Sequence, residues 1–425
     1  MQHKCPRPKV LLIMEQCNPE WASVPLVASH FYQGIRQLAE VTLVTHARNE
    51  QALERVKNGH VIDYVHESPW IKTYYSWMRR LTSRSGTNWP LQHVLTYPVY
   101  AQFNSAVYKR YAPRVRAGHY DLVHAMTPIL PRYPVKMVKA CSKTPFVLGP
   151  VNGGVPFPPG FSEVAKREFA QYNVLRSLTK LLPGYAATYR QAGLVLPAST
   201  FTRDMVQSRF SLPDTKIELF HENGVSSTLQ QPQADKDPRR CSLLFVGRLV
   251  PYKGADMALE ALSRVPQDYA SKVDLTIVGD GPEMGALQAL SRDLGLSDRV
   301  RFTGWIPQEE TSRYYLQADV FCFPSVREFG GAVALEAMAH GLPCIVPDYA
   351  GLGEYVPQDA GLKIEPRSRD FLVGEIAEAM TVLASKPDMR RKMADKALAR
   401  AKEYLWSRKA QRMVDIYRRV LECAQ

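Results

Sequence analysis

The sequence lacks the marks of a secreted or membrane-spanning chain. The apolar stretch near the N-terminus ends at Glu15 after about five residues, which is too short for a signal peptide. No apolar run approaches the roughly 18 residues of a spanning helix. The seven cysteines are scattered and form no C-x-x-C pair, as is typical of reduced thiols rather than of a disulfide or metal framework. We therefore expect a soluble cytoplasmic protein.

Two nucleotide-binding signatures are also missing. No G-x-G-x-x-G opens the first helix and there is no Walker lysine motif, which argues against a nicotinamide enzyme. An Asp-x-Asp triplet occurs at 235–237, but it lies in a polar stretch and not at a strand end, so we assign no metal site to it. The 45% hydrophobic and 22% charged content is that of a globular protein.

Acidic residues are scarce in one part of this chain of net charge +13. Between Glu67 and Glu163 the sole acidic residue is Asp121, against twelve lysines and arginines. The first part of this span, 68–120, is also rich in Trp, Tyr and Phe. Such a surface attracts anions, for example nucleic acid, phospholipid headgroups or a phosphorylated substrate. The alternative is a solvated basic face over a tyrosine-rich core.

The order of the expected elements indicates an α/β protein of two domains. Short apolar runs alternate with helical patterns, as in parallel sheets with crossover helices. The polar stretch 226–240 is typical of a linker, which gives domains at 1–225 and 241–404. The candidate strands of the first domain are 10–14, 41–45, 61–65, 121–125, 145–149, 194–198 and 217–220. Those of the second are 242–247, 274–279, 300–304, 320–324, 343–347 and 362–366, and the helices expected in the first domain are 25–39, 90–117 and 161–182.

The segment 327–343, REFGGAVALEAMAHGLP, has the features of an anion site. Gly330 and Gly331 lie at an expected strand-to-helix turn, where free backbone N–H groups and the helix dipole attract anions. Glu328 lies at the same turn, and Glu336 lies early in the helix. Because carboxylates accept hydrogen bonds from vicinal hydroxyls, a nucleotide would satisfy all of these groups. The alternative is a pair of glutamates that need no ligand.

A second candidate segment is 245–254, FVGRLVPYKG. The expected strand ends at Gly247, and the loop that follows carries Arg248 and Lys253. Two cations after a strand suit a diphosphate whose charge grows as it departs. The alternative is a pair of solvated basic residues.

These segments together resemble the donor-binding signatures of family 4 (group 1) retaining glycosyltransferases. The similarity is carried, in the family's order, by GRLVPYKG (247–254), VGDGPE (278–283), FTGWIP (302–307) and PSVREFGGAVALEAMAHGLP (324–343). The resemblance implies a GT-B fold, in which two Rossmann-like, doubly wound domains face a cleft. It also implies that the C-terminal domain binds a nucleotide sugar, that the final helix (about 405–425) returns to the N-terminal domain, and that no metal or other cofactor is required.

The resemblance also implies roles for individual residues. Arg248 and Lys253 would hold the diphosphate and stabilise it as it leaves. Glu336 would bind the ribose hydroxyls, and Glu328 the donor sugar. The remaining donor contacts that it implies are Gly247, Phe329, Gly330, Gly331, Trp305, Ile306 and Glu354.

The first domain departs from the family pattern. The family often has a Gly-Gly loop after its first strand, whereas this chain has EQCNPEWASVP (15–25), in which Asn18, Ser23 or backbone groups would replace that contact. His124 ends a strand where the family often places a histidine near the sugar, but the position of the family's critical histidine is occupied by Met126. His124 is therefore either catalytic or structural. Asn152 and Gly153 would shape the acceptor side of the cleft, or form an ordinary turn.

The sequence therefore predicts a retaining glycosyltransferase that moves a sugar from a nucleotide-diphosphate sugar to an acceptor hydroxyl. The basic, aromatic first domain predicts a lipid-linked saccharide as acceptor and a peripheral position on the inner face of the membrane, in the synthesis of a cell-surface polysaccharide or glycolipid. One alternative is a GT-B-fold sugar-nucleotide epimerase. The other is a non-catalytic binder of anionic lipid or nucleic acid. The intact set of motif residues argues against a degenerate site, and no nucleic acid partner is expected.

Overall fold

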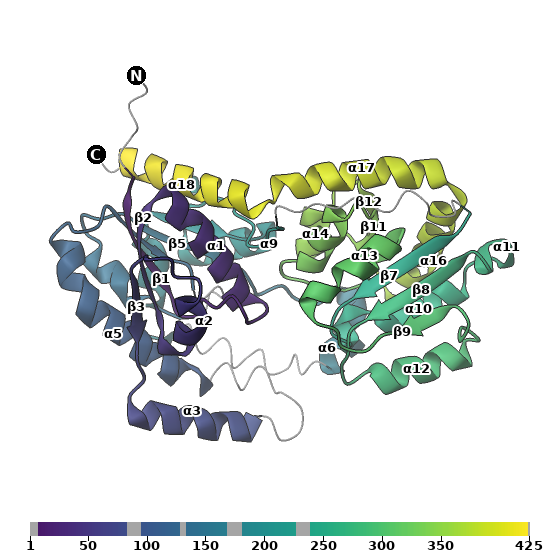
Figure 1. Ribbon diagram of the computed structural model, residues 1–425, viewed down its shortest axis with the longest axis horizontal. Coiled ribbons are helices and arrows are strands. Elements are labelled where there is room, and N and C mark those ends of the chain that lie inside the picture. The colour runs from purple at the N-terminus through teal and green to yellow at the C-terminus, as the bar shows by residue number, and fades with distance from the viewer. Residues whose placement is uncertain (1–6, 83–94, 128–132, 168–180, 227–238, 424–425) are drawn as a thin grey trace. The chain divides into compact units, whose positions relative to one another are not determined.

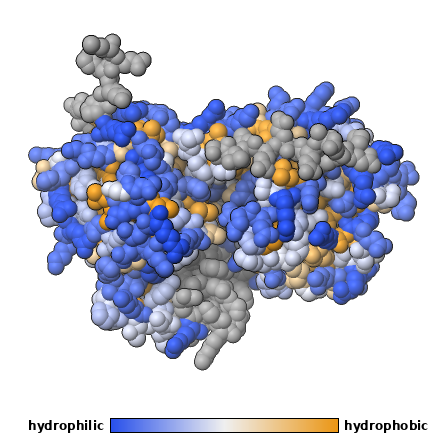
Figure 2. All heavy atoms as spheres, in the orientation of Figure 1, coloured by the Kyte–Doolittle hydropathy of each residue, from blue (hydrophilic) through white to orange (hydrophobic). Residues whose placement is uncertain are grey.

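The computed structural model describes residues 7–82, 95–127, 133–167, 181–226 and 239–423 (Figure 1). The chain forms two compact units. Unit 1 consists of Met1–Gly154, Gln171–Glu222 and Trp406–Gln425, and unit 2 of Val155–Ala170 and Asn223–Leu405. Charged and polar residues cover most of the face of each unit that Figure 2 shows.

Unit 1 is built on a six-stranded sheet of order β3-β2-β1-β4-β5-β6, and all of its strand pairs are parallel. Helices cover both faces of such a sheet, which explains why the strands are nearly continuous apolar runs. β1 lies in the middle and pairs with both β2 and β4. The strands are β1 (Lys9–Met14), β2 (Glu40–His46), β3 (Ile62–Val65), β4 (Leu122–Ala125), β5 (Phe146–Val151) and β6 (Leu194–Pro197).

The helices of unit 1 include the C-terminal helix of the chain, α18, which packs beside α1 (Figure 1). Trp406 of α18 stacks on His30 with ring centroids 4.6 Å apart. A Cβ on Gly34 would lie 2.5 Å from the Ala410 Cβ, so the close approach of the two helices requires glycine there. The return of the final helix to the first domain is confirmed. The helices are α1 (Val24–Leu38), α2 (Glu50–Glu54), α3 (Pro69–Thr82), α5 (Tyr97–Arg116), α8 (Tyr185–Arg190), α9 (Thr200–Phe210) and α18 (Trp406–Glu422).

Unit 2 repeats this topology. Its six-stranded sheet has the order β12-β11-β10-β7-β8-β9, so its first strand is again central and the chain runs outward on both sides of it. Each sheet therefore has the strand order of a doubly wound nucleotide-binding fold, as the sequence predicts. The strands are β7 (Cys241–Val246), β8 (Val273–Val278), β9 (Val300–Phe302), β10 (Val320–Cys322), β11 (Cys344–Pro347) and β12 (Gly361–Ile364).

Helices also flank the unit 2 sheet, and its core combines residues of the strands with apolar residues of α10, α14 and α16. The C-terminal part of the chain forms two helices, α17 in unit 2 and α18 in unit 1. The helices of unit 2 are α6 (Ser162–Arg167), α10 (Ala255–Ser263), α11 (Gln267–Ala270), α12 (Met284–Asp293), α13 (Ser312–Gln317), α14 (Ala332–Ala339), α15 (Ala350–Tyr355), α16 (Arg369–Ser385) and α17 (Pro387–Glu403).

One segment lies in a different unit from the one expected. The sequence places 155–170 in the first domain, whereas the structure includes it in unit 2. Phe161 belongs to the core of unit 2, and a Cβ on Gly160 would lie 2.1 Å from the Arg367 carbonyl oxygen. Arg167 forms an ion pair with Glu283 at 2.8 Å. These contacts join residues far apart in the chain, so local sequence patterns do not show them.

Other expected elements differ at their ends. The candidate strand 217–220 forms only an isolated bridge, between Val195 and Ile217. The expected helix 161–182 is present as α6, and its remainder falls mainly at 168–180, outside the described residues. Most of the expected linker, 227–238, is also outside them. Among the described helices, none is long and apolar enough to cross a bilayer.

Candidate functional site

The candidate site lies at the carboxyl ends of β7 and β10 in unit 2. These adjacent strands continue to opposite sides of the sheet, which makes this the switch point where doubly wound sheets bind ligands. The loop after β7 carries Arg248 and leads into the short 3-10 helix η7 (Pro251–Lys253). The loop after β10 carries Glu328, Gly330 and Gly331. The topology thus brings the two candidate segments to one edge of the sheet.

Lys253 and Glu328 form an ion pair at this edge, although they are 75 residues apart in the chain. Their side chains are only 16% and 17% exposed. The Lys253 ammonium also lies 5.1 Å from the centre of the Phe323 ring. Because water screens a mostly buried pair less than an exposed one, each charge fixes the position of the other. The structure therefore holds a cation and a carboxylate side by side at the carboxyl ends of β7 and β10.

The glycine turn that follows Glu328 is held by contacts from two other segments. Gly331 has φ 53° and caps the N-terminus of α14, a left-handed conformation that glycine adopts readily. The Asn223 side chain donates a 2.6 Å hydrogen bond to the Gly330 carbonyl. A Cβ on Gly351 would lie 2.4 Å from the Phe329 carbonyl oxygen, so this approach too requires glycine. The first turn of α14 is thus fixed with its N–H groups facing the loop end, where they suit an anion.

Glu336 lies on α14, one turn further along the chain. Tyr315 donates a 3.1 Å hydrogen bond to its Oε2 atom. Burial raises the pKa of Glu336, whereas hydrogen bonds from the side chains of Tyr315 and Gln308 lower it. This carboxylate is therefore placed in a polar niche within an otherwise apolar region.

The remaining predicted donor contacts lie on neighbouring loops of unit 2. Gly247 directly follows β7, and its carbonyl oxygen would be 2.0 Å from a Cβ on Gly279. Trp305 is 73% exposed on the loop after β9, and Ile306 packs against the core. Glu354 lies on α15, where its carbonyl accepts a hydrogen bond from Arg400. Their contacts with a donor stay predictions.

Residues 227–400 match the family of group 1 glycosyl transferases. The match covers this part of the chain, which is less than half of its length. A D-inositol 3-phosphate glycosyltransferase of Frankia alni is 30% identical over 281 residues, which cover 64% of this chain and 65% of the relative. A GDP-mannose-dependent phosphatidylinositol monomannoside mannosyltransferase of Mycobacterium tuberculosis is 31% identical over 220 residues, or 47% and 57% of the two chains. The matched region thus spans less than two thirds of these relatives.

Solved structures agree on the fold. The Anabaena protein Alr3699/HepE in complex with UDP has a TM-score of 0.63 at 16% identity, covering 97% of this chain and all of its own. The lipopolysaccharide outer core galactosyltransferase WaaB has a TM-score of 0.62 at 17% identity, covering 96% and 99%. Together with the two parallel sheets, these similarities confirm the GT-B fold.

Outside the matched region, His124 is fully buried at the end of β4. Burial lowers its pKa to about 4, so the imidazole is neutral near neutral pH. A carbonyl oxygen only accepts hydrogen bonds, so Nε2–H donates to Gly149 at 2.6 Å and the Tyr417 hydroxyl donates to Nδ1 at 2.6 Å. Both ring nitrogens are therefore used within unit 1. This geometry favours the structural alternative, and a catalytic role stays a prediction.

The predicted acceptor residues Asn18 and Asn152 are each 2% exposed. Asn18 accepts a 2.9 Å hydrogen bond from the Glu20 backbone, which fixes the loop after β1. Asn152 donates to Glu222 at 2.6 Å and accepts from Thr202 at 3.1 Å, and Gly153 donates its backbone N–H to the same threonine at 3.2 Å. These bonds shape the loops of unit 1, and contact with an acceptor stays a prediction.

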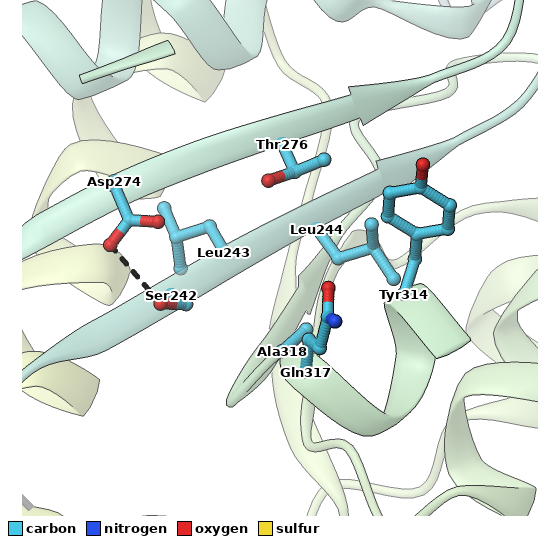
Figure 3. A pocket seen from close by; sticks show the side chains of 8 residues that line it. All are labelled: Ser242, Leu243, Leu244, Asp274, Thr276, Tyr314, Gln317 and Ala318. Carbon is cyan, nitrogen blue, oxygen red and sulfur yellow. Dashed lines mark hydrogen bonds between the residues drawn. The ribbon is translucent and has the colours of Figure 1, made fainter. Parts of the chain in front are cut away.

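A cavity of about 140 Å³ in unit 2 lies apart from these residues (Figure 3). Ser242 and Asp274, joined by a 3.1 Å hydrogen bond, lie near the amino ends of β7 and β8, at the opposite edge of the sheet from Gly247. None of the predicted site residues lines it. Its lining is formed by Ser242, Leu243, Leu244, Asp274, Thr276, Tyr314, Gln317 and Ala318.

Several residues that fix the donor-side loops are not predicted as site residues by the sequence. Asn223, Gly351 and Tyr315 hold the glycine turn or Glu336 from other segments of the chain. Asn223 stands in an Asn-Gly pair, which is the one local signal among them. Among the described residues, no group of side chains is placed to hold a metal ion.

Proposed function

We propose that the chain is a retaining glycosyltransferase that moves a sugar from a nucleotide-diphosphate sugar to an acceptor hydroxyl. The observation that carries the proposal is the Lys253–Glu328 ion pair beside the N-terminus of α14. A cation for the diphosphate, a carboxylate for sugar hydroxyls and a second carboxylate for the ribose stand at one switch point. The curated relatives named above are glycosyltransferases, and a structural neighbour was solved with UDP-glucose. These similarities support a transferase over an epimerase.

The positive charges serve the departing group. Arg248 and Lys253 offset the charge that grows on the diphosphate as its bond to the anomeric carbon breaks. The acceptor hydroxyl oxygen forms the new bond on the same face of the sugar, and its proton passes to the departing diphosphate. Configuration is thereby retained. The proposal includes no metal, because the two side chains and the α14 N-terminus supply the positive potential.

Glu328 and Lys253 would be arranged before the donor arrives. Their pairing already fixes both side chains. Lys253 is therefore in place for the donor phosphate and Glu328 for the hydroxyls of the donor sugar, so less conformational entropy is lost when the donor binds. Glu328 therefore acts in this proposal as a sugar ligand and not as a general acid or base.

A lipid-linked saccharide is the acceptor that we propose, with the chain peripheral on the cytoplasmic face of a membrane. Helix α3 supports this, because Trp70 and Trp77 are 62% and 55% exposed while Ile71 and Met78 are buried. Lys72 is exposed on the same helix. Exposed tryptophans beside cations are typical of helices that lie in a bilayer interface. Aromatic residues of α5 are instead buried in the core of unit 1. The aromatic stretch 68–120 therefore includes exposed residues, as a binding surface requires, and also core residues, as the alternative of a tyrosine-rich core requires.

Vesicle sedimentation tests the membrane part of the proposal. The protein should sediment with phosphatidylglycerol vesicles at low salt, and the double substitution Trp70→Ala with Trp77→Ala should abolish this. Trp21→Ala, at a residue that is 44% exposed in unit 1, is the matched control and should bind as the wild type does. No sedimentation of the wild type would contradict the membrane proposal without affecting the donor site.

A thermal-shift screen of UDP, GDP and ADP sugars tests the transferase itself. A ligand that binds only the folded state raises the unfolding temperature, so one base class should stabilise the protein. Product formation should then require an acceptor. Release of an epimerised free sugar without any acceptor would instead favour the epimerase, and no stabilisation by any nucleotide sugar would overturn both readings.

A further inference from the structure

Tyr315 on α13 is a buried residue that the proposed chemistry does not use. Its side chain is 1% exposed, and its hydroxyl donates a 3.1 Å hydrogen bond to Oε2 of Glu336 on α14. A buried phenol hydroxyl without a partner would destabilise the fold, so this bond satisfies both groups. The pair links a core aromatic residue of one helix to the proposed ribose ligand of the next.

The ring of Tyr315 is fixed by its neighbours. It stacks on His340 with centroids 5.0 Å apart and planes at 16°, and its ring centroid also lies 6.1 Å from that of Phe321. His340 is fixed in turn, because its Nδ1–H donates to the Glu336 carbonyl at 2.7 Å and Ser312 donates to its Nε2 at 2.9 Å. The phenol therefore cannot swing away without breaking this stack.

The hydrogen bond from Tyr315 helps to keep Glu336 ionised in its buried surroundings. Burial raises the pKa of Glu336, and the hydrogen bonds from Tyr315 and Gln308 lower it. Burial also raises the pKa of Tyr315 and lowers that of His340, so both of these titratable neighbours are neutral near neutral pH. The carboxylate thus depends on neutral donors, and not on a cation, to remain ionised.

We propose that Tyr315 is a positioning residue that holds Glu336 as an oriented carboxylate for the ribose of the donor. This inference rests on the proposed function. With Oε2 held by the phenol, the remaining lone pairs can accept hydrogen bonds from two vicinal hydroxyls. A protonated or rotated carboxyl would lose an acceptor and would discriminate poorly between ribose and deoxyribose.

The variant Tyr315→Phe removes the hydroxyl and keeps the ring stack. The matched control is Tyr314→Phe, the adjacent tyrosine of α13, whose hydroxyl accepts a 3.2 Å hydrogen bond from Arg313. Calorimetry is done with whichever of UDP, GDP and ADP binds the wild type, and with its 2′-deoxy counterpart. Tyr315→Phe should bind the ribonucleotide about tenfold more weakly, while the deoxynucleotide changes about twofold or less. Tyr314→Phe should match the wild type.

The pH dependence supplies a readout that a purely structural role would not move. Binding of the ribonucleotide requires the ionised carboxylate, so it falls as the pH drops through the pKa of Glu336. Loss of the phenol donor raises this pKa further, so in Tyr315→Phe the fall should begin at a higher pH. Gln308→Ala, at an exposed residue whose loss leaves the core intact, should shift the profile in the same direction.

The possible results distinguish a failure of the proposed function from a failure of the positioning role of Tyr315. If the wild type binds no nucleoside diphosphate, the proposed function fails and this inference fails with it. If the wild type binds but Tyr315→Phe has the same affinity and pH profile, only the positioning role is overturned. Equal weakening of ribonucleotide and deoxynucleotide would also overturn it, because that would report a general distortion. Glu336→Gln should bind the ribonucleotide and the deoxynucleotide with similar affinity, both in the presence of Tyr315 and in combination with Tyr315→Phe.

Discussion

Replacing Lys253 separates its role in stability from its role in the reaction. In the free protein Lys253 pairs with Glu328, and the two side chains are 16% and 17% exposed. Exposed pairs contribute about 0–1 kcal/mol, and breaking a buried pair costs about 3–5 kcal/mol. At this exposure we expect a coupling free energy of about 1–2 kcal/mol in the unfolding of the free protein. Lys253→Ala should lower stability by this amount, and the double variant with Glu328→Gln should recover part of it.

The effect on the reaction should differ in size and should not be recovered. A hydrogen bond to a charged group contributes about 1.5–3 kcal/mol, which corresponds to about 10–150-fold in donor affinity. Because charge grows on the leaving diphosphate, turnover should fall further than affinity does. Restoring stability with Glu328→Gln does not restore a cation, so the double variant should remain as inactive as Lys253→Ala.

Urea unfolding, calorimetry with the donor nucleotide and a nucleotide-release assay measure the three quantities. The matched control is Lys363→Ala, which removes another mostly buried lysine of unit 2, 13% exposed and paired with Asp348 at 3.0 Å. This control should lower stability and leave donor affinity unchanged. Unchanged affinity and turnover in Lys253→Ala, or recovered turnover in the double variant, would refute the reasoning.

Three further predictions concern other groups. His124→Leu should lower stability by about 2–4 kcal/mol, since it leaves two buried hydrogen-bond partners unmatched, but should leave the donor affinity intact; a large loss of turnover in a folded variant would instead indicate catalysis. Burial lowers the pKa of Lys409 to about 7 from 10.5, so its charge destabilises the fold most below about pH 7, and this cost is lost as the pH rises toward 10.5. Unfolding should therefore show wild-type stability rising over that range by on the order of 5 kcal/mol from this group, and Lys409→Met should remove this part of the slope. Finally, EDTA should leave the rate of nucleotide release unchanged, whereas inactivation that Mg²⁺ or Mn²⁺ reverses would show a metal requirement.

Much of the fold follows from local sequence patterns. The strands of both sheets are short apolar runs separated by helical patterns, and this alternation predicts doubly wound sheets. The candidate strand at 217–220 was wrong because this segment forms one isolated bridge, at Ile217, and its two backbone hydrogen bonds to β6 do not extend into a strand. Segment 155–170 could not be assigned from the sequence, because its place depends on contacts with distant residues such as Arg367.

The candidate site was predicted in part. Motifs after two strands indicated a cation loop and a carboxylate turn, and the parallel topology brings their ends together. Their direct pairing could not be predicted, since Lys253 and Glu328 are 75 residues apart. Tyr315 gave no signal, because a buried tyrosine in a short helix such as α13 has the same pattern as any core aromatic residue. Trp70 and Trp77 could have been separated from the core by helical spacing, since they lie seven residues apart on the exposed face of α3.

The central claim is that unit 2 binds a nucleotide-diphosphate sugar at the carboxyl ends of β7 and β10. Calorimetric titration of the wild type with UDP, GDP and ADP sugars tests it most directly. Sugars of one base should bind one per chain, with a dissociation constant between about 1 μM and 1 mM, and Lys253→Ala and Glu336→Gln should both weaken this binding. If no nucleotide sugar binds, or if both variants bind as the wild type does, unit 2 does not hold the donor site.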